Sequence, residues 1–341
     1  MATPELSLPS PVEQRMRTVS IAGIGSYLPE RVLTNQDLEK MVDTTDEWIQ
    51  TRTGIQERHL AREDETTSDM AAEAARRALA HAGVAADEVD VIIVATITPD
   101  MVFPNTACFV QEKIGASKAF CFGLEAACSG FLYSLDVGKQ FVATGAAETV
   151  LVIGAEKLSS ITDWEDRSTC VLFGDGAGAA VLQARGDRYG IANTVMGSDG
   201  ALAELLHVPA GGSRAPATIQ SVEARLHYLK MAGSEVFKNA VRAMSDSARR
   251  VLEQAGLTID DVDLLVPHQA NRRIIEAIGS RLGIDSEKVF MNLDRTGNTS
   301  AASVPLALDE AVQTGRLERG QLVLIIVFGG GFTWGAGLVE W

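Results

Sequence analysis

Apolar positions along the chain alternate between two patterns, a helical spacing and short continuous runs. In residues 75–83 and 248–256 the apolar positions recur at helical spacing, and both segments end at an Ala-Gly pair whose glycine can cap a helix. A short acidic loop follows in each case, and then an apolar run, "VDVIIV" or "VDLLVP". Such runs between helices predict sheets that helices cover on both faces.

The two segments are parts of a longer internal repeat. "ARRALAHAGVAADEVDVIIV" (75–94) aligns without a gap with "ARRVLEQAGLTIDDVDLLVP" (248–267). The same offset pairs "VLVI" (150–153) with "VLII" (323–326), which argues against a chance likeness of two ordinary helix–loop–strand units. We therefore predict an α/β chain with a flexible N-terminal tail (1–17), an N-terminal half (18–185) and a C-terminal half (186–341), packed as a layered α/β/α/β/α structure.

The composition limits which binding partners and which cellular location we expect. The 341 residues carry a formal net charge of −15, which argues against nucleic acid as a general partner. No apolar run reaches the roughly 18 residues of a membrane span, and the start "MATPELSLPSPVEQRMR" lacks the apolar core of a signal peptide. The four cysteines show no CxxC spacing, so we expect neither a disulfide framework nor a metal site, and we expect Cys108, Cys121 and Cys170 to be core thiols. Together these features favour a cytoplasmic protein with reduced thiols.

The two halves differ in polar residues at matching places. Cys128 stands at the start of a central helical pattern, and Asn298 lies near the equivalent helix start of the second half. His268 follows the apolar run "VDLLVP". Polar residues at strand ends and helix starts of paired α/β halves commonly face the cleft between them. Each residue taken alone also has a purely structural explanation. Cys128 could be a buried structural thiol, His268 a histidine whose ring nitrogens are simply hydrogen bonded, and Asn298 a residue of a turn.

Longer blocks around these residues carry a family resemblance. "EAACSGFLYSL", "VPHQANRRI" and "DRTGNTSAASVPLALDEA" resemble the catalytic blocks of the thiolase-type condensing enzymes, and most closely β-ketoacyl-acyl carrier protein synthase III. "IGSYLPERVLTNQDLEKMVDTTDEWIQTRTGIQERH" and "FGGGFTWGAGLV" are similar to the opening and closing blocks of that family. The resemblance implies a thiolase-like duplicated five-layer fold and a Cys-His-Asn triad at Cys128, His268 and Asn298.

The chemistry of the triad accounts for its residue types. A thiol attacks a thioester as the thiolate, and a helix N-terminus favours negative charge by roughly 0.3–2 kcal/mol, enough to bring the pKa of Cys128 near 7. By resemblance, neutral donors on His268 and Asn298 stabilise an enolate formed when malonyl loses CO₂. The family's second oxyanion hole uses backbone N–H groups that match Cys128 and Gly330, where glycine permits close approach and a positive φ.

The resemblance also implies a binding path for coenzyme A. Trp48 and Arg167 sandwich the adenine, and Arg52 lies near the nucleotide phosphates. Further positions line the pantetheine tunnel, close the partner's acyl pocket, or dock an acidic carrier protein: Gly233, Phe237 and Asn271 for the tunnel, Phe103 for the pocket, and Arg272, Arg273 and Lys238 for the carrier. For Arg272, Arg273 and Lys238, the alternative is a basic surface that contacts only solvent.

The expected function is the start of type II fatty-acid synthesis. A short acyl-CoA, with acetyl-CoA favoured by a bulky Phe103, condenses with malonyl-acyl carrier protein in a homodimer that uses no cofactor, because coenzyme A enters as a thioester substrate. Neither nucleic acid nor membrane is an expected partner. Three alternatives remain: a related enzyme of secondary metabolism with another primer or acceptor, a non-catalytic subunit, and a degradative thiolase-like enzyme.

Overall fold

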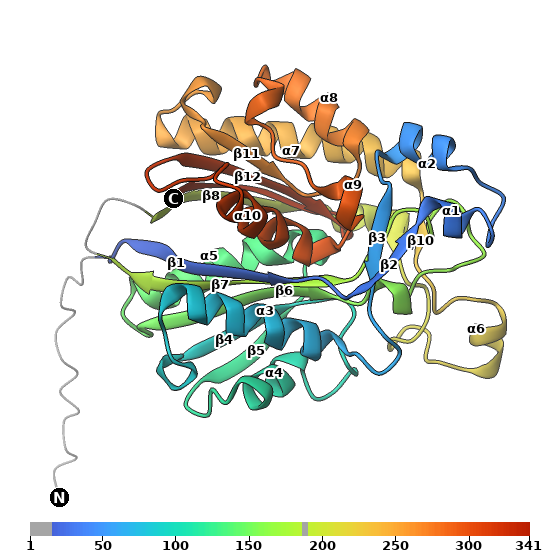
Figure 1. Cartoon of the computed structure of the whole chain (residues 1–341), viewed down its shortest axis with the longest axis horizontal. Helices are drawn as coiled ribbons and strands as arrows, with labels where there is room; N and C mark the ends of the chain where they lie inside the picture. Colours follow the sequence, from blue (N-terminus) through green and yellow to red (C-terminus); the bar gives the residue numbers. More distant parts are fainter. Residues whose placement is uncertain (1–15, 186–189) are drawn as a thin grey trace, which may run out of the picture.

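The computed structural model describes residues 16–185 and 190–341, so nearly all of the predicted tail, residues 1–15, lies outside the described residues. Two sheets lie one above the other, with helices outside each and a pair of helices between them (Figure 1). This is the five-layer α/β/α/β/α arrangement that the repeat predicted. Within the described ranges, no helix combines the length and the apolar character that a membrane span requires.

The N-terminal sheet has five strands in the order β1-β7-β6-β4-β5. Its central strands β6, β4 and β5 run parallel to one another, and β7 and β1 continue the sheet in antiparallel fashion. The strands are β1 (Val19–Tyr27), β4 (Val91–Ala95), β5 (Phe120–Leu124), β6 (Thr149–Glu156) and β7 (Gly176–Ala184). Because β5 ends the sheet, its outer backbone groups have no strand partner among residues 16–185 and 190–341.

The C-terminal sheet repeats this plan. Its order is β11-β12-β13-β8, with β11 and β12 parallel and the remaining pairs antiparallel. The strands are β8 (Gly190–Ser198), β11 (Leu264–Pro267), β12 (Leu322–Gly329) and β13 (Thr333–Glu340). A parallel bridge from Leu265 to Val289 adds a short extra segment beside β11, in the place that β5 occupies beside β4.

The helices cover both sheets and separate them. α3 (Thr67–Ala82) and α4 (Thr106–Ile114) lie outside the N-terminal sheet, and α7 (Gly233–Ala255) and α8 (Arg272–Leu282) outside the C-terminal one (Figure 1). α5 (Gly130–Ala143) and α10 (Ser303–Gln313) lie between the sheets. There, Phe131 and Leu132 of α5 and Leu308 of α10 are fully buried in one apolar cluster that joins both halves.

Individual elements of the two halves correspond in detail. α3 and α7 both end at a glycine in the left-handed conformation, Gly83 with φ 70° and Gly256 with φ 70°. The offset that relates these glycines also relates the first residues of α5 and α10 and both ends of β6 and β12. The internal repeat read from the sequence is therefore a structural duplication.

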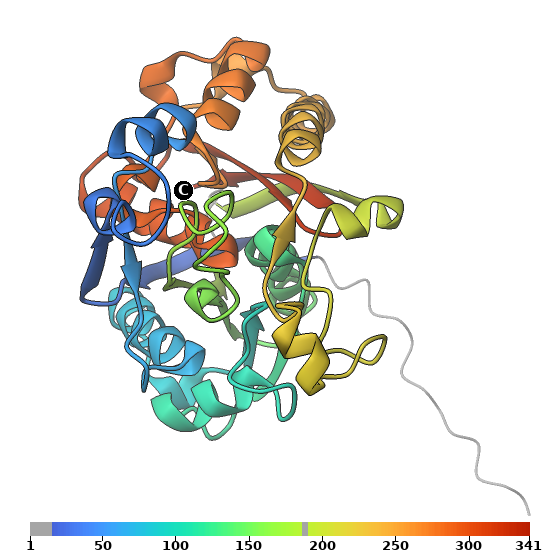
Figure 2. The same ribbon diagram turned by 90° about the vertical axis from the view of Figure 1, so that its right-hand side faces the viewer.

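Shorter elements gather at one end of the molecule, which Figure 2 views directly. They include two small antiparallel pairs, β2 with β3 and β9 with β10. Their bounds, with those of the short helices, are β2 (Arg31–Thr34), α1 (Asn35–Leu38), α2 (Asp46–Thr53), β3 (Glu57–Leu60), β9 (Leu206–His207), α6 (Ile219–Glu223), β10 (Lys230–Met231) and α9 (Leu293–Thr296).

Candidate active site

Cys128 lies in a single 3₁₀ turn, η2 (Ala127–Ser129), that leads directly into α5. The equivalent turn of the second half, η7 (Ser300–Ala302), leads into α10, and the two turns contact each other. Each turn also packs against the central strand of the other half, η2 against β12 and η7 against β6. The predicted nucleophile therefore stands where the two halves interlock.

Glycines make this interlock possible. A Cβ atom on Gly329, the last residue of β12, would lie 2.6 Å from the backbone nitrogen of Cys128. A Cβ on Gly154 of β6 would lie 2.3 Å from the carbonyl oxygen of Ala301. Both distances are far shorter than carbon–oxygen or carbon–nitrogen contacts allow, so only glycine permits the strands to approach the turns this closely.

Both turns hold a non-glycine residue in the left-handed region. Ala127 has φ 47°, and Ser300, at the equivalent position of the second half, has φ 49°. Such conformations cost energy for residues with a Cβ, and they persist where surrounding packing enforces them. Here they direct the next residue, Cys128 in one half and Ala301 in the other, into the interface.

Burial dominates the electrostatics of the nucleophile. Cys128 is 9% exposed, and desolvation raises the pKa of its thiol from 9.0 to about 12, with the Glu156 carboxyl adding to the rise and a hydrogen bond with Ser300 opposing it. The expectation that a helix start brings this pKa near 7 is therefore wrong for the enzyme without substrate. The resting nucleophile is a neutral thiol, and attack on a thioester requires its proton to leave.

His268 follows β11 and is held at both its backbone and its ring. Its N–H donates to the carbonyl of Ile326 at 2.8 Å, and its Nδ1 lies 2.6 Å from the hydroxyl of Ser303. The backbone N–H of Gln269 donates to the same Ser303 oxygen at 3.4 Å, so we assign the Ser303 hydroxyl proton to the bond with Nδ1. The ring then carries its own proton on Nε2, and burial lowers its pKa from 6.5 to about 3, which keeps the ring neutral.

Asn298 is buried and its carboxamide is fixed. Its backbone N–H donates to the carbonyl of Leu172, and its own carbonyl accepts from Gly174. Its Oδ1 accepts from the backbone N–H of Ser300 at 2.9 Å. With the oxygen engaged in this way, the amide NH₂ is the group left to donate elsewhere.

One contact network joins the three predicted residues. Ser300 contacts the Cys128 thiol through its hydroxyl and orients Asn298 through its N–H, and Ser303, on the next turn of the chain, holds His268. The buried site offers one sulfur and two neutral donors, His268 Nε2–H and the Asn298 amide. This set suits thioester chemistry in which negative charge develops on oxygen.

The expectation for Gly330, in the closing block "FGGGFTWGAGLV", needs one correction. Gly330 lies next to η2, since a Cβ on it would be 3.8 Å from the Cβ of Ala127. However, Gly330 is absent from the positive-φ residues, and the left-handed backbone belongs to Gly331, with φ 134°. The close approach to Cys128 belongs to Gly329, whereas Gly330 approaches the Leu206 carbonyl, from which a Cβ would lie 3.1 Å away; of the two reasons given for glycine at position 330, the positive φ is wrong.

The residues expected to bind the adenine are brought together more tightly than a sandwich allows. The guanidinium carbon of Arg167 lies 4.9 Å from the ring centre of Trp48, and that of Arg52 lies 5.9 Å from it. Two stacking contacts of about 3.5 Å each would need about 7 Å between ring and guanidinium. Arg167 therefore has to move for a base to enter, and its half-exposed side chain must then release the hydrogen bond that it donates to the Asp43 carbonyl.

The expected tunnel and docking residues gather around the first turns of α7 and α8. Phe237 lies under the guanidinium of Arg273, with 5.8 Å between ring centre and Cζ. Asn271 caps α8, accepting from the N–H of Arg273, and donates to the carbonyl of Arg52. Gly233 begins α7. Arg272 and Lys238 are exposed, and Lys238 pairs with Glu235 at 2.8 Å.

The remaining cysteines depart in part from the expectation of core thiols. Cys170 is buried, as expected, but Cys108 is exposed and Cys121 is half-buried. Their sulfur atoms lie 3.7 Å apart. The expectation was wrong for Cys108, because α4 turns this side chain outward at the edge of the N-terminal sheet.

Sequence reasoning missed three polar residues of the site: Glu156, Ser300 and Ser303. Both serines lie within the block "GNTSAAS", whose first residues were singled out. Glu156 ends the buried strand β6, so the rule that pointed to His268, a polar residue directly after an apolar run, could have found it. The roles of the two serines, in contrast, become visible only in the contacts between the two halves.

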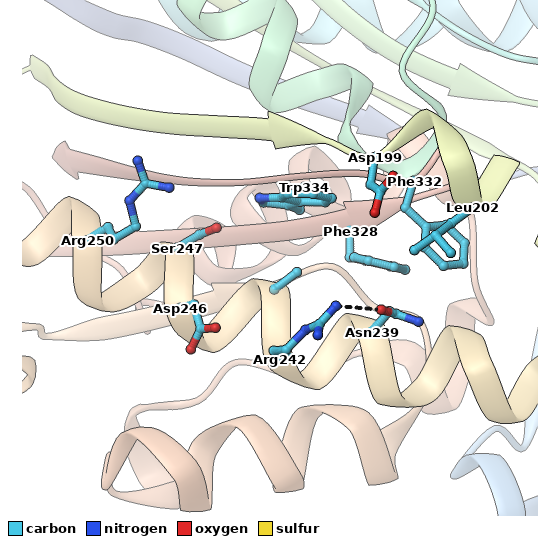
Figure 3. Close-up of a pocket in the computed structure, with 11 residues that line it drawn as sticks. Asp199, Leu202, Asn239, Arg242, Asp246, Ser247, Arg250, Phe328, Phe332 and Trp334 are labelled. Carbon is cyan, nitrogen blue, oxygen red and sulfur yellow. Dashed lines mark hydrogen bonds between the residues drawn. The ribbon is translucent and has the colours of Figure 1, made fainter.

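A surface cavity of about 390 Å³ lies elsewhere, between α7 and the ends of β12 and β13 (Figure 3). Arg242 and Asp246 of α7 and the aromatic rings of Phe328 and Trp334 line it. None of the triad residues lines this cavity. Within residues 16–185 and 190–341, no cluster of three or more His, Cys, Asp or Glu side chains could hold a metal ion.

Comparison with known proteins identifies similar chains over nearly the full length. The family described as 3-Oxoacyl-[acyl-carrier-protein (ACP)] synthase III matches residues 122–200, and its C-terminal counterpart matches residues 252–341. A relative from Desulfitobacterium hafniense, "Beta-ketoacyl-[acyl-carrier-protein] synthase III", is 56% identical over 326 residues, 96% of this chain and 98% of the relative. A protein of the same name from Clostridioides difficile is 54% identical and covers 94% of this chain and 98% of its own.

Solved structures agree with the sequence relatives. The 3-oxoacyl-[acyl-carrier-protein] synthase III of Aquifex aeolicus superimposes with a TM-score of 0.88 at 51% identity, over 95% of this chain and all of that one. The priming β-ketosynthase of the R1128 polyketide biosynthetic pathway superimposes with a TM-score of 0.89 at 39% identity, over 98% of both chains.

The state of His268 is directly measurable. We predict that nitrogen NMR of histidine-labelled protein shows this ring neutral and protonated on Nε2 at pH 7. It stays neutral at pH 5, because burial holds its pKa far below the ordinary value near 6.5. The signal is identified by its loss in His268→Ala, and a titration midpoint of that signal above pH 6 would contradict the assignment.

Proposed function

Because the chain belongs to the β-ketoacyl-[acyl-carrier-protein] synthase III family, whose members are condensing acyltransferases, we propose that it joins a short acyl group from acyl-CoA to malonyl-acyl carrier protein with loss of CO₂. Acetyl-CoA is the proposed primer. The observation that carries the proposal is the buried network that unites Cys128, His268 and Asn298 through Ser300 and Ser303.

The first half-reaction loads the enzyme. Cys128 Sγ attacks the thioester carbon, the carbonyl oxygen becomes an oxyanion, and the thiol of coenzyme A leaves. The backbone N–H groups of Cys128 and Gly330 are the proposed donors to this oxyanion, and proximity of Gly330 to η2 supports that role. The product is an acyl thioester on Cys128.

The second half-reaction forms the carbon–carbon bond. Malonyl thioester loses CO₂, and the electron pair of the broken bond becomes an enolate, whose carbon attacks the acyl thioester. We assign His268 Nε2–H and the Asn298 amide as donors to the enolate oxygen. Both are neutral and pre-positioned, so they stabilise the developing charge without reorganisation of the site. The new 3-oxoacyl group departs on the carrier, and the Cys128 sulfur is released.

Substrate entry fits the end of the molecule where α2, α7 and α8 meet. We assign Trp48, Arg52 and Arg167 to the nucleotide of coenzyme A, with Arg167 swinging away from Trp48 as the base enters. Gly233, Phe237 and Asn271 are assigned to the pantetheine arm. Arg272, Arg273 and Lys238 supply exposed positive charge for an acidic carrier in an otherwise acidic protein.

Another primer is the second candidate. The similarity to a priming ketosynthase of a polyketide pathway supports it, since that structure covers the chain as completely as the others. The two candidates share the mechanism above and differ in which acyl group reaches Cys128. Loading assays with acyl-CoA thioesters of several lengths distinguish them.

Three substitutions test the division of roles. We predict that Cys128→Ser abolishes acyl loading, because the weakly acidic hydroxyl cannot replace the thiol. His268→Ala and Asn298→Ala should still load acyl groups, yet lose malonyl decarboxylation by about 100-fold or more, the usual cost of one oxyanion donor. Intact-protein mass spectrometry measures loading, and CO₂ release measures decarboxylation. Cys108→Ser is the matched control, and normal decarboxylation in both alanine variants would refute the roles.

We also propose that two copies of the chain associate through β5. This strand ends its sheet, and the loop before α4 leaves Val102 and Phe103 93% and 86% exposed. Phe120 of β5 is 52% exposed and packs with Phe141 in an aromatic cluster at the same edge. Antiparallel pairing of two β5 strands about a two-fold axis would cover this apolar edge and bring Phe103 to the partner's acyl pocket.

The proposed interface predicts a change of mass. The wild-type chain should sediment at twice its chain mass, and Phe120→Lys should sediment as a monomer, because the charge would be buried between two strands. Ile219→Lys provides the control, since Ile219 is also exposed but lies on α6. A monomeric wild type, or equal disruption by both variants, would rule out the interface.

A further inference from the structure

A buried carboxyl group lies behind the nucleophile. Glu156 is the last residue of β6 and is fully buried. Its Oε2 accepts hydrogen bonds from the Thr98 hydroxyl at 2.5 Å and the Thr96 hydroxyl at 3.1 Å, and from the backbone N–H groups of residues 97 and 98. Nothing in the triad chemistry above uses this group.

A single side chain connects this carboxyl to the nucleophile. The Ser300 hydroxyl donates to Glu156 Oε1 at 3.0 Å, and the same hydroxyl lies close enough to Cys128 to lower the pKa of its thiol, across the contact between η7 and η2. Ser300 is buried and its backbone has φ 49°, so its position is fixed by the interlocking turns. Cys128, Ser300 and Glu156 therefore form a continuous chain of groups that can pass a proton.

We propose that Glu156 accepts the proton of Cys128 through the Ser300 hydroxyl during acyl loading and returns it after condensation. This inference rests on the proposed function and concerns the same site. It answers a question that burial raises: the neutral thiol has to lose its proton as it attacks, and only 9% of this residue is exposed to solvent.

Acyl loading moves two protons while one bond to the acyl carbon forms and another breaks. As the Cys128 Sγ–C bond forms, the thiol proton passes to Ser300 Oγ while the Ser300 proton passes to Glu156 Oε1. The bond between the acyl carbon and the sulfur of coenzyme A then breaks, and the leaving thiolate takes a proton from water. The acyl-enzyme is left with a neutral Glu156.

Condensation reverses the transfer. Loss of CO₂ from malonyl thioester gives the enolate, its carbon attacks the acyl group, and the Cys128 sulfur leaves as a thiolate. Glu156 returns its proton to that sulfur through Ser300, which restores the thiol and the carboxylate. Because Glu156 is neutral while the malonyl carboxylate and the enolate occupy the site, it does not repel either charge.

The surroundings of Glu156 suit a group that changes charge near neutral pH. Burial raises its pKa from 4.5 to about 7, while bonds from Thr98, Ser300, Thr96 and the backbone oppose the rise. The titratable group that faces it across η7 is Cys128. The adjacent Lys157 turns its ammonium away, to the carbonyls of residues 62 and 65. A proton acceptor works best when its pKa lies near the working pH.

Bracing of the 96–98 loop is the competing role for Glu156. Glutamine at this position keeps the shape and can still accept from Thr98 and the backbone, but it cannot take up a proton. A bracing role therefore predicts a loading defect that is independent of pH. A proton-accepting role predicts a defect that grows as Glu156 ionises.

The test measures single-turnover acetylation of the full-length protein by acetyl-CoA between pH 6 and 8, with quenched samples weighed by mass spectrometry. We expect Glu156→Gln to load about 100-fold or more slowly than wild type at pH 8. The ratio of wild-type to variant rate should fall by about tenfold at pH 6, because a group with pKa about 7 is mostly protonated there. Ser300→Gly should show the same pH-dependent ratio, since glycine removes the side chain that carries the proton and readily adopts the positive φ of this position, and the double variant should be no slower.

Asp175→Asn is the matched control. Asp175 is also buried, its pKa is also raised by burial, and it is hydrogen bonded by Ser159 and Ala61. We expect this variant to load like wild type. A ratio that does not change with pH, or unchanged loading in Glu156→Gln, would overturn the proton transfer. If Glu156→Gln does not fold, Ser300→Gly decides by the same criterion. Failure of wild-type protein to load any acyl-CoA would refute the proposed function itself.

Discussion

The site depends on a reciprocal contact between the two halves. The central strand of each half, β6 or β12, packs against the 3₁₀ turn of the other half. β6 ends against η7 and β12 ends against η2, and glycine at positions 154 and 329 removes the side chains that would keep them apart. The contact is therefore made twice, once from each half. It is this geometry that holds the strained residues Ala127 and Ser300, and with them Cys128 and Asn298.

The same contact removes water, and burial then decides the charge of each group. Desolvation moves the pKa of Cys128 from 9.0 to about 12, which at about 1.36 kcal/mol per pKa unit corresponds to about 4 kcal/mol. A helix N-terminus supplies roughly 0.3–2 kcal/mol in the opposite direction, so burial outweighs it. The three triad residues are thus a neutral thiol, a neutral imidazole and a carboxamide in the resting enzyme, and negative charge develops beside them as bonds form and break. The serines of "GNTSAAS" hold two of the site's groups, Ser303 the His268 ring and Ser300 the Glu156 carboxyl, and the proposed proton transfer runs through Ser300.

Much of this arrangement was predictable from local sequence patterns. The helix–glycine–strand unit that occurs twice predicted α3 with β4 and α7 with β11, and the shared offset predicted the duplication. Cys128, His268 and Asn298 followed from long blocks of family resemblance. The elements that escaped prediction depend on contacts between residues distant in sequence. Glu156 gains its link to Cys128 only through Ser300 of the other half, and the pKa of Cys128 depends on how deeply the opposite sheet covers it. The pairing of Arg167 with Trp48 depends likewise on the packing of a loop against α2, which is distant from it in sequence.

The most direct measurement of the central claim is a crystal structure with a stable analogue of malonyl thioester bound. The account predicts that the analogue's thioester oxygen lies about 3 Å from both His268 Nε2 and the Asn298 amide nitrogen, with the carbon that becomes nucleophilic facing Cys128 Sγ. An oxygen bound by neither group, or side chains of these three residues opening into separate cavities, would contradict it.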